Sequence, residues 1–327
     1  MSKVYLASPN PLALAGDWWT DLERLRASAL KSQPACHGLV DFPELADVIL
    51  FSDAQTIDQS DIRDHELTRR FPDRIFVYSA LDKVVPHFPG VYTSAERGWF
   101  ISTRMKAGVY VKVISHNWIE YSETNAAERP YLFSFLGSFD THPVRRKLAE
   151  LRTARGLIRD TSQDEGRGFG KSTATYQDWQ KAYFESIRDC AFVLCPRGVC
   201  PSSYRIFEAM RAGRVPVIVA DAWIPPIGPE WSDFSIRVPE CAISELPQIL
   251  EKIEPRAGEM GRRARLEWER WFSDLTIFQT IVEWCLELQG KGNISRSLSS
   301  ALPYLHYARP FFFRHAILAR AKRMIIR

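Results

Sequence analysis

The sequence predicts an α/β fold of two domains, each built around a parallel sheet. Short apolar runs alternate along the chain with longer amphipathic or charged segments, which is the pattern of strands joined by crossover helices. The 327 residues suffice for two ordinary domain cores. The polar segment 123–130 ends in a proline, interrupts this alternation and is the expected linker. We therefore expect an N-terminal domain over 1–125, a C-terminal domain over 130–290 and a tail over 295–327.

The expected elements follow in chain order. The N-terminal half predicts buried strands at Val4–Ala7, Val48–Phe51, Ile75–Tyr78 and Tyr110–Ile114, with helical segments at Trp18–Leu30 and Asp61–Arg70. The C-terminal half predicts strands at Tyr131–Leu136, Phe192–Cys195 and Val215–Val219, helices at Pro143–Arg155, Tyr176–Ile187, Ser203–Arg211, Glu245–Ile253 and Gly258–Leu288, and a polar loop at Asp160–Thr175. Ligands bind at the carboxyl ends of strands in open α/β sheets, so we expect a binding cleft where these ends face each other.

The amino-acid composition excludes several classes of protein. A hydrophobic content of 46% and a charged content of 25% are typical of a soluble globular chain, and a net charge of +4 gives no reason to expect nucleic acid as a partner. The six cysteines lie mostly in apolar runs, which favours reduced, buried thiols over disulfides or a zinc site. No apolar stretch reaches the length of a membrane span, and the N-terminus lacks a secretory core. We expect a cytoplasmic protein.

The most informative stretch lies between residues 191 and 219. An apolar strand ends at a Pro-Arg-Gly loop that contains Arg197 and Gly198, and Ser203 then occupies the expected N-cap of a helix. A helix start attracts anions through its free N–H groups and its dipole, and Arg197 and Arg205 add full charges. Glu208 follows Arg205 by one helical turn. Cations for a diphosphate and a carboxylate for a ribose diol are what a sugar-nucleotide site needs, although a structural ion-pair cluster is the alternative.

This stretch resembles the exostosin family of glycosyltransferases. The family carries a Pro-Arg-Gly loop, a Ser-x-Arg-x-x-Glu-Ala helix start and an Ala-Gly-x-x-Pro-Val ending, and the chain has these in order at 196–198, 203–209 and 212–217. The resemblance spans about residues 130–285. It implies the GT-B architecture, in which two Rossmann-like domains face each other across a cleft, with the donor nucleotide on the C-terminal domain. It also implies that no metal or other cofactor is required.

The resemblance implies an inverting transferase that moves a sugar from a nucleotide donor, a UDP-sugar, to a saccharide or lipid-linked acceptor in surface polysaccharide synthesis. Gly137 ends a strand and permits close approach of a ligand, and Arg145 follows in the first turn of the next helix. The expected donor-binding residues are Gly137, Arg145, Arg197, Gly198, Ser203, Arg205 and Glu208. Alternatives are a retaining transferase, an epimerase, and a non-catalytic subunit that binds a nucleotide sugar.

Inversion requires a general base, which in this fold comes from the N-terminal domain beyond a strand end. Asp82 is the first candidate because the loop that follows it contains two prolines and His87. Asp53 and His87 are the other candidates, with His116 further off. Acidic residues after strands more often cap helices or form turns, so each candidate also has a purely structural explanation.

The glycine-rich segment 166–172 approaches a nucleotide-triphosphate P-loop, but its spacing is one residue short and no apolar strand precedes it. We expect a flexible loop there. No Asp-x-Asp triplet is present to hold a metal against a diphosphate.

The end of the chain, 301–327, combines aromatic residues with six Arg or Lys residues and has no acidic residue. A basic helix with an aromatic side favours binding to the inner-membrane surface, which would make the protein peripheral. The alternative is a helix that packs on the N-terminal domain. The two explanations are compatible.

Overall fold

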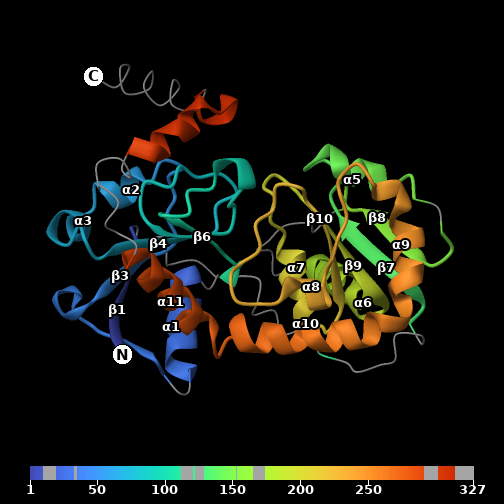
Figure 1. Cartoon of the computed structure of the whole chain (residues 1–327), viewed down its shortest axis with the longest axis horizontal. Helices are drawn as coiled ribbons and strands as arrows, with labels where there is room; N and C mark the ends of the chain where they lie inside the picture. The colour runs from blue at the N-terminus through green and yellow to red at the C-terminus, as the bar shows by residue number, and fades with distance from the viewer. Residues whose placement is uncertain are drawn as a thin grey trace.

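The computed structural model describes residues 1–9, 20–32, 35–111, 121, 129–151, 153–164, 174–290 and 301–313. Two domains lie side by side, each with a sheet at its centre and helices packed around it (Figure 1). Every strand pairing in both sheets is parallel. The predicted α/β fold of the GT-B type, with two Rossmann-like domains, is confirmed. The expected linker lies almost entirely outside the described residues.

The N-terminal sheet has six strands in the order β2-β1-β3-β4-β5-β6. Its strands are β1 (Ser2–Ala7), β2 (His37–Leu39), β3 (Val48–Phe51), β4 (Ile75–Ser79), β5 (Gly90–Tyr92) and β6 (Met105–Ala107). The helices α1 (Asp21–Lys31), α2 (Ser60–Arg63) and α3 (Glu66–Arg70) connect them, with short 3-10 turns at Pro43–Leu45 and Arg97–Trp99. The strand order reverses between β1 and β3, so this sheet has its topological switch point there.

The C-terminal sheet has five strands in the order β11-β10-β9-β7-β8. Its strands are β7 (Tyr131–Gly137), β8 (Gly156–Asp160), β9 (Cys190–Pro196), β10 (Val215–Val219) and β11 (Ile236–Arg237). Its helices are α5 (Pro143–Leu148), α6 (Ala174–Arg188), α7 (Tyr204–Arg211), α8 (Trp231–Phe234), α9 (Leu246–Ile253) and α10 (Ala257–Trp271), with 3-10 turns at Ile243–Glu245 and Glu254–Arg256. The order reverses between β7 and β9, which places the switch point at the ends of these two strands.

The helix predicted at Gly258–Leu288 is two helices. The helix α10 ends at Trp271, and α11 (Ile277–Gly290) begins after a short break. Figure 1 shows α10 running along the lower edge of the molecule toward the N-terminal domain, where α11 packs beside α1. The chain thus returns to its first domain, and a salt bridge between Lys106 of β6 and Glu287 of α11 holds it there.

Several other predicted boundaries were wrong for local reasons. The last N-terminal strand is β6 rather than Tyr110–Ile114. The sequence did not indicate β6 because its central residue, Lys106, is charged and is buried in a salt bridge with Glu287. Residues 112–114 lie outside the described residues. The predicted helix Pro143–Arg155 ends at Leu148, and β8 lies between the predicted helix and the predicted loop, where no strand was predicted. The strands β2 and β5 have only three residues each and include a glycine, so they lack a visible apolar run.

Direct contacts join the two domains near the cleft. Glu96 and Trp223 form an isolated antiparallel bridge, and the Arg97 amide donates to the carbonyl of Ala222 at 2.9 Å. The C-terminal segment, defined here as residues 301–313 with a 3-10 turn at Leu302–Ala308, lies on the N-terminal domain (Figure 1). Its Arg309 forms a salt bridge with Glu96, at 2.5 Å. The C-terminal segment therefore sits beside the domain boundary.

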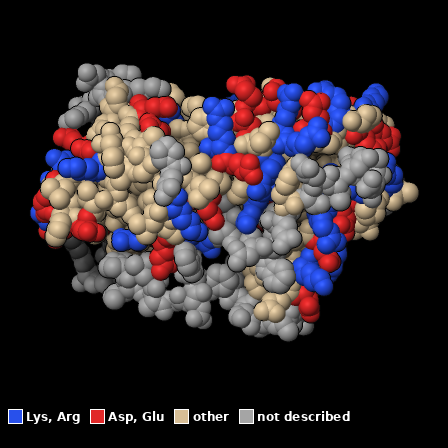
Figure 2. All heavy atoms as spheres, turned by 90° about the horizontal axis from the view of Figure 1, so that it is seen from below, with Lys and Arg blue, Asp and Glu red and all other residues tan. Residues whose placement is uncertain are grey.

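The face seen in Figure 2 carries positively and negatively charged side chains interspersed, without one continuous field of either sign. Within the described ranges, no helix combines the length and apolar character needed to cross a bilayer.

Candidate functional site

A cavity of about 240 Å³ opens at the carboxyl ends of β7 and β8. This is the switch point of the C-terminal sheet, where open α/β sheets bind their ligands. Its walls come from the ends of β7 and β8 and from the helices α5, α6 and α7, through Leu136, Gly137, Ser138, Thr141, Arg145, Thr161, Tyr176, Trp179, Tyr204 and Arg205. Three of the predicted donor-binding residues, Gly137, Arg145 and Arg205, therefore lie together on one cavity.

Arg145 connects the two strand ends across the switch point. Its Nη1 donates to the carbonyl of Ser138 after β7 at 3.1 Å. Its Nε donates to the carbonyl of Arg197 at 2.9 Å, and its Nη2 to that of Pro196 at 3.3 Å, both at the end of β9. Burial and, to a smaller extent, the neighbouring Arg205 charge lower the pKa of Arg145 to about 10. The site thus holds two cations close together.

Arg205 projects from the first turn of α7 and is 3% exposed. Its Nη2 donates to the carbonyl of Leu136 at 2.6 Å, and its guanidinium lies 4.5 Å from the ring centre of Phe135. A Cβ on Gly137 would come within 2.9 Å of this Nη2, and one on Gly198 within 3.0 Å of the Nη2 of Arg145. Both predicted glycines therefore stand where a guanidinium passes close to the backbone.

Glu208 is 4% exposed and accepts a hydrogen bond of 2.5 Å from the Tyr183 hydroxyl. Burial raises its pKa to about 7, against the opposing effects of the Tyr183 hydrogen bond and the Arg205 charge. Glu208 does not line the cavity, and its observed partner is a tyrosine of α6. Its predicted contact with a ribose stays a prediction.

Arg197 and Ser203 lie beside this cavity rather than on it. The Arg197 side chain points toward Glu240, at 3.9 Å, and its amide donates to the carbonyl of Val219 at 3.0 Å. Ser203 occupies the N-cap position of α7 as predicted, but its side chain makes no capping hydrogen bond.

A second, smaller cavity of about 40 Å³ lies between the domains. Asp82 and Arg197 line it from opposite domains, and His306, Arg309 and Phe312 line it from the C-terminal segment. Burial lowers the pKa of His306 to about 4, which keeps its ring neutral. Of the three predicted bases, Asp82 is the one on this cavity, and it faces the loop that follows β9.

Cys200 links Asp82 to the C-terminal domain. Its Sγ donates to Oδ1 of Asp82 at 3.4 Å and lies 3.1 Å from the Tyr110 hydroxyl. Burial raises the pKa of the Cys200 thiol to about 12, so the thiol stays protonated and acts as a donor. The ring of Tyr110 also meets Tyr204 of the first cavity edge-on, with ring centres 6.2 Å apart. Cys200 thus lines the smaller cavity, and Tyr110 lies between it and Tyr204 of the larger one.

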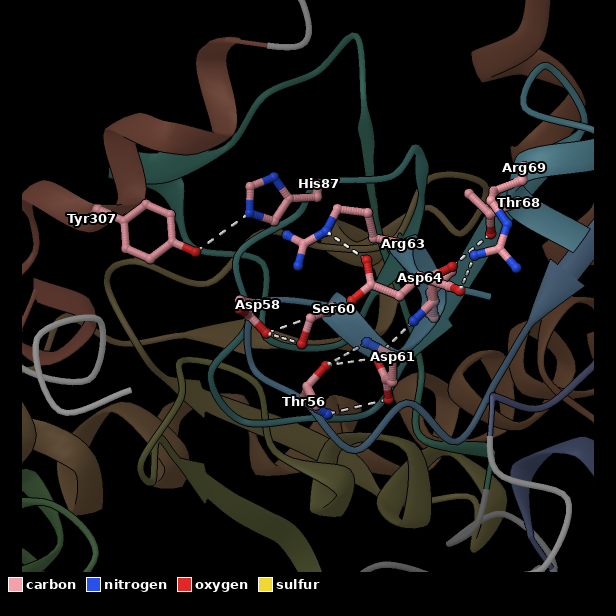
Figure 3. Close-up of polar contacts among 11 residues, drawn as sticks. Thr56, Asp58, Ser60, Asp61, Arg63, Asp64, Thr68, Arg69, His87 and Tyr307 are labelled. Atoms are coloured by element: carbon pink, nitrogen blue, oxygen red, sulfur yellow. Dashed lines mark hydrogen bonds and ion pairs between the residues drawn. The ribbon is translucent and has the colours of Figure 1, made fainter. Parts of the chain in front are cut away.

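The other two base candidates have structural partners. The Asp53 carboxylate accepts hydrogen bonds from the amides of Asp21 and Leu22, at 3.1 and 3.0 Å, and so caps α1. His87 faces the C-terminal segment, with its Nε2 3.5 Å from the Tyr307 hydroxyl (Figure 3). Burial lowers its pKa, and the charge of Arg63 contributes. His116 lies outside the described residues, as does the glycine-rich segment 166–172.

Two groups of residues that line the cavities were not predicted from the sequence. One is a row of aromatic rings on α6, at 176, 179 and 183, whose spacing is visible in the sequence but is also that of an ordinary buried helix face. The other is the inner side of the C-terminal segment, whose proximity to Asp82 no local pattern indicates. Among the described residues, no three His, Cys, Asp or Glu side chains are grouped to hold a metal ion. Independence from metals stays a prediction.

The raised pKa of Glu208 makes stability depend on pH. The carboxyl titrates near 4.5 when exposed and near 7 in the folded chain, so between these values the unfolded chain ionises first and unfolding is favoured. Glu208→Gln removes this titration. We expect its free energy of unfolding, relative to the wild type in urea, to rise by on the order of 1–3 kcal/mol from pH 5 to pH 8. The exposed Glu251→Gln is the control and should show a flat difference. A flat difference for Glu208→Gln would mean that the carboxyl is not buried as described.

The Pro-Arg-Gly loop lies within a region of the chain that matches a known protein domain. Residues 106–253 match the Exostosin GT47 domain. The chain is 25% identical over 197 residues to Exostosin-1 of Drosophila melanogaster, covering 55% of this chain and 25% of that protein. It is 28% identical over 165 residues to Exostosin-2 of Bos taurus, covering 48% and 23%. It is 31% identical over 136 residues to the probable glucuronosyltransferase GUT1 of Oryza sativa subsp. japonica, covering 34% and 33%. The matches thus span a quarter to a third of these relatives' length.

Among solved structures, Anabaena Alr3699/HepE in complex with UDP is similar at a TM-score of 0.39 and 11% identity, covering 88% of this chain and 100% of that chain. WaaG, a glycosyltransferase involved in lipopolysaccharide biosynthesis, is similar at a TM-score of 0.36 and 11% identity, with the same coverage. Likeness at this level supports no conclusion about ligands. The matched domain and the curated relatives, together with the Pro-Arg-Gly motif, support the resemblance of the chain to the exostosin family of glycosyltransferases.

Proposed function

We propose that the chain transfers a sugar from a nucleotide diphosphate donor, a UDP-sugar, to a hydroxyl of a saccharide or lipid-linked saccharide, with inversion at the sugar carbon. The observation that carries the proposal is the pairing of Arg145 and Arg205 on one cavity at the switch point of an exostosin domain. The family implies UDP as the nucleotide and surface polysaccharide synthesis as the setting.

The two arginines suit a diphosphate leaving group. Negative charge builds on the departing phosphate as the glycosidic bond breaks, and fixed cations in a partly dry site stabilise that charge most effectively. Because both guanidiniums are already held by backbone carbonyls, they need little reorganisation when the donor binds. Such an arrangement does the work that a metal ion does in other transferases, so we propose a transferase that needs none.

Asp82 is the proposed general base. Its carboxylate takes the proton of the acceptor hydroxyl while that oxygen bonds to the sugar carbon and the bond to the diphosphate breaks. The position of Asp82 opposite Arg197 on the interdomain cavity supports this role. A retaining transferase or an epimerase would give a different product stereochemistry, and a non-catalytic subunit would bind the nucleotide without turnover.

Asp82→Asn should reduce transfer by a factor on the order of 100 or more, because a positioned proton acceptor contributes about that much. Release of UDP from a UDP-sugar is measured with a saccharide acceptor panel in EDTA, and UDP binding is measured by calorimetry. Asp64→Asn, an exposed carboxylate of the same domain, is the control. We expect wild-type turnover in EDTA and unchanged UDP affinity in Asp82→Asn. Near-normal turnover in Asp82→Asn would reject it as the base, and turnover that requires added manganese would reject metal independence.

We also propose that the C-terminal segment places the protein on the cytoplasmic surface of the inner membrane. Its inner side packs on the N-terminal domain through His306 and Phe312, which are 3% and 2% exposed. Large apolar side chains of this segment remain exposed, namely Tyr304, Leu305, Phe311 and Phe313. The 14 residues that follow contain five Arg or Lys and no acidic residue. Apolar side chains beside basic residues favour an anionic lipid surface.

The double variant Leu305→Ser, Phe313→Ser should lose most of its sedimentation with anionic phosphatidylglycerol vesicles, because it removes apolar contacts while keeping the fold. Leu266→Ser, an equally exposed leucine on α10, is the control and should sediment like the wild type. High salt should weaken binding of the wild type, since the charge attraction acts over about a Debye length. A wild-type chain that ignores these vesicles at low salt would contradict the membrane proposal.

A further inference from the structure

The helix α6 carries three aromatic residues, Tyr176, Trp179 and Tyr183, spaced so that they share one face. Their rings are nearly parallel. The interplanar angle is 9° between Tyr176 and Trp179 and 8° between Trp179 and Tyr183, with ring centres 6.3 and 5.4 Å apart. Parallel rings at these separations are offset from one another, which is the favourable arrangement for aromatic stacking. The face therefore presents a series of aligned planes.

This row of rings extends from Arg205, which contacts Tyr183, to the wall of the cavity. At one end the guanidinium of Arg205 lies 5.4 Å from the ring centre of Tyr183, whose hydroxyl donates to Glu208. At the other end Tyr176 and Trp179 line the 240 Å³ cavity together with Arg205. Trp179 is only half-buried, whereas Tyr176 and Tyr183 are 6% and 3% exposed. A ring that served the core alone would not need to keep surface on the cavity.

The cavity thus has two chemically distinct walls. One wall is cationic, with Arg145 and Arg205 at the strand ends, and the other is aromatic, with Tyr176 and Trp179 on α6. The Tyr176 hydroxyl accepts a hydrogen bond from Nε2 of Gln180 at 3.0 Å, which fixes the ring within the row. A nucleoside diphosphate has the same division, with two anionic phosphates at one end and a flat, weakly polar base at the other.

We infer that the aromatic wall is the subsite for the nucleobase of the donor and that this nucleobase stacks against Trp179. This inference rests on the proposed function, because it assigns the parts of the donor within the cavity. A nucleobase can lie against the part of the Trp179 ring that is exposed to the cavity. Stacking on an aromatic side chain is favourable for any nucleobase because each has a π face. With the base on α6 and the diphosphate on Arg145 and Arg205, Trp179 determines how the donor is oriented.

The test separates the base from the phosphates by using two ligands. Calorimetric titrations with UDP and with inorganic pyrophosphate are carried out on the wild type, Trp179→Ala, Trp179→Phe and Gln177→Ala. Gln177 is an exposed neighbour on the same helix outside the cavity, so its variant is the matched control. Thermal unfolding checks that each variant is folded, and Trp179→Phe keeps a stacking ring if Trp179→Ala proves unstable.

We expect Trp179→Ala to weaken UDP binding by roughly 5- to 100-fold, the range found for base–aromatic stacking. Pyrophosphate affinity should stay the same, Trp179→Phe should recover most of the loss, and Gln177→Ala should bind both ligands like the wild type. Unchanged UDP affinity in Trp179→Ala would overturn the inference, and so would an equal loss for UDP and pyrophosphate, which would mean that Trp179 only shapes the cavity. A wild-type chain that binds neither ligand would instead overturn the proposed function.

Discussion

The architecture of the candidate site depends on how the Arg145 guanidinium binds the ends of β7 and β9. These adjacent strands lie at the switch point, and their ends present backbone carbonyl groups to the Arg145 side chain. Arg145 satisfies those of Ser138, Pro196 and Arg197 with its three nitrogens. A planar group with a fixed set of donors holds two loops in one geometry, which a flexible ammonium cannot do. The Pro-Arg-Gly loop and the start of α7 are thereby set in place.

This constraint concentrates positive charge at the cavity. Arg145 and Arg205 donate mainly to neutral carbonyls. The nearby carboxyl of Glu208 has a pKa near 7 and accepts its hydrogen bond from the Tyr183 hydroxyl. The pKa of Arg145 is lowered by its burial and by the neighbouring Arg205 charge, so the Arg145 cation carries an electrostatic penalty in this site. An anion that reaches both guanidiniums would relieve that penalty, which is the physical reason for proposing a diphosphate ligand.

The sequence predicted the secondary structure around the candidate donor site better than the rest, because the signals there are local. The strand β9, the loop with Arg197 and Gly198, and the helix α7 follow one another within 22 residues, and the helix is followed by Gly213, which has a positive φ of 66°. The contacts that depend on distant residues could not be predicted. Lys106 lies inside a strand only because Glu287 returns to it from α11, and the C-terminal segment reaches Asp82 only through the fold. Asp53 could be seen to follow a strand, but its role as the cap of α1 requires the packing of that helix.

The central claim is that the cavity at the switch point binds a diphosphate through the guanidinium that organises it. Adjacent residues of α5 allow a direct test, because Arg145 is held in the cavity while the Arg146 side chain is 69% exposed. The measurement is the calorimetric affinity for UDP of Arg145→Gln and Arg146→Gln, each checked for a folded state by circular dichroism. The account predicts a loss of about 10-fold or more for Arg145→Gln, as for a charged hydrogen bond, and no change for Arg146→Gln. Wild-type affinity in a folded Arg145→Gln variant would contradict it.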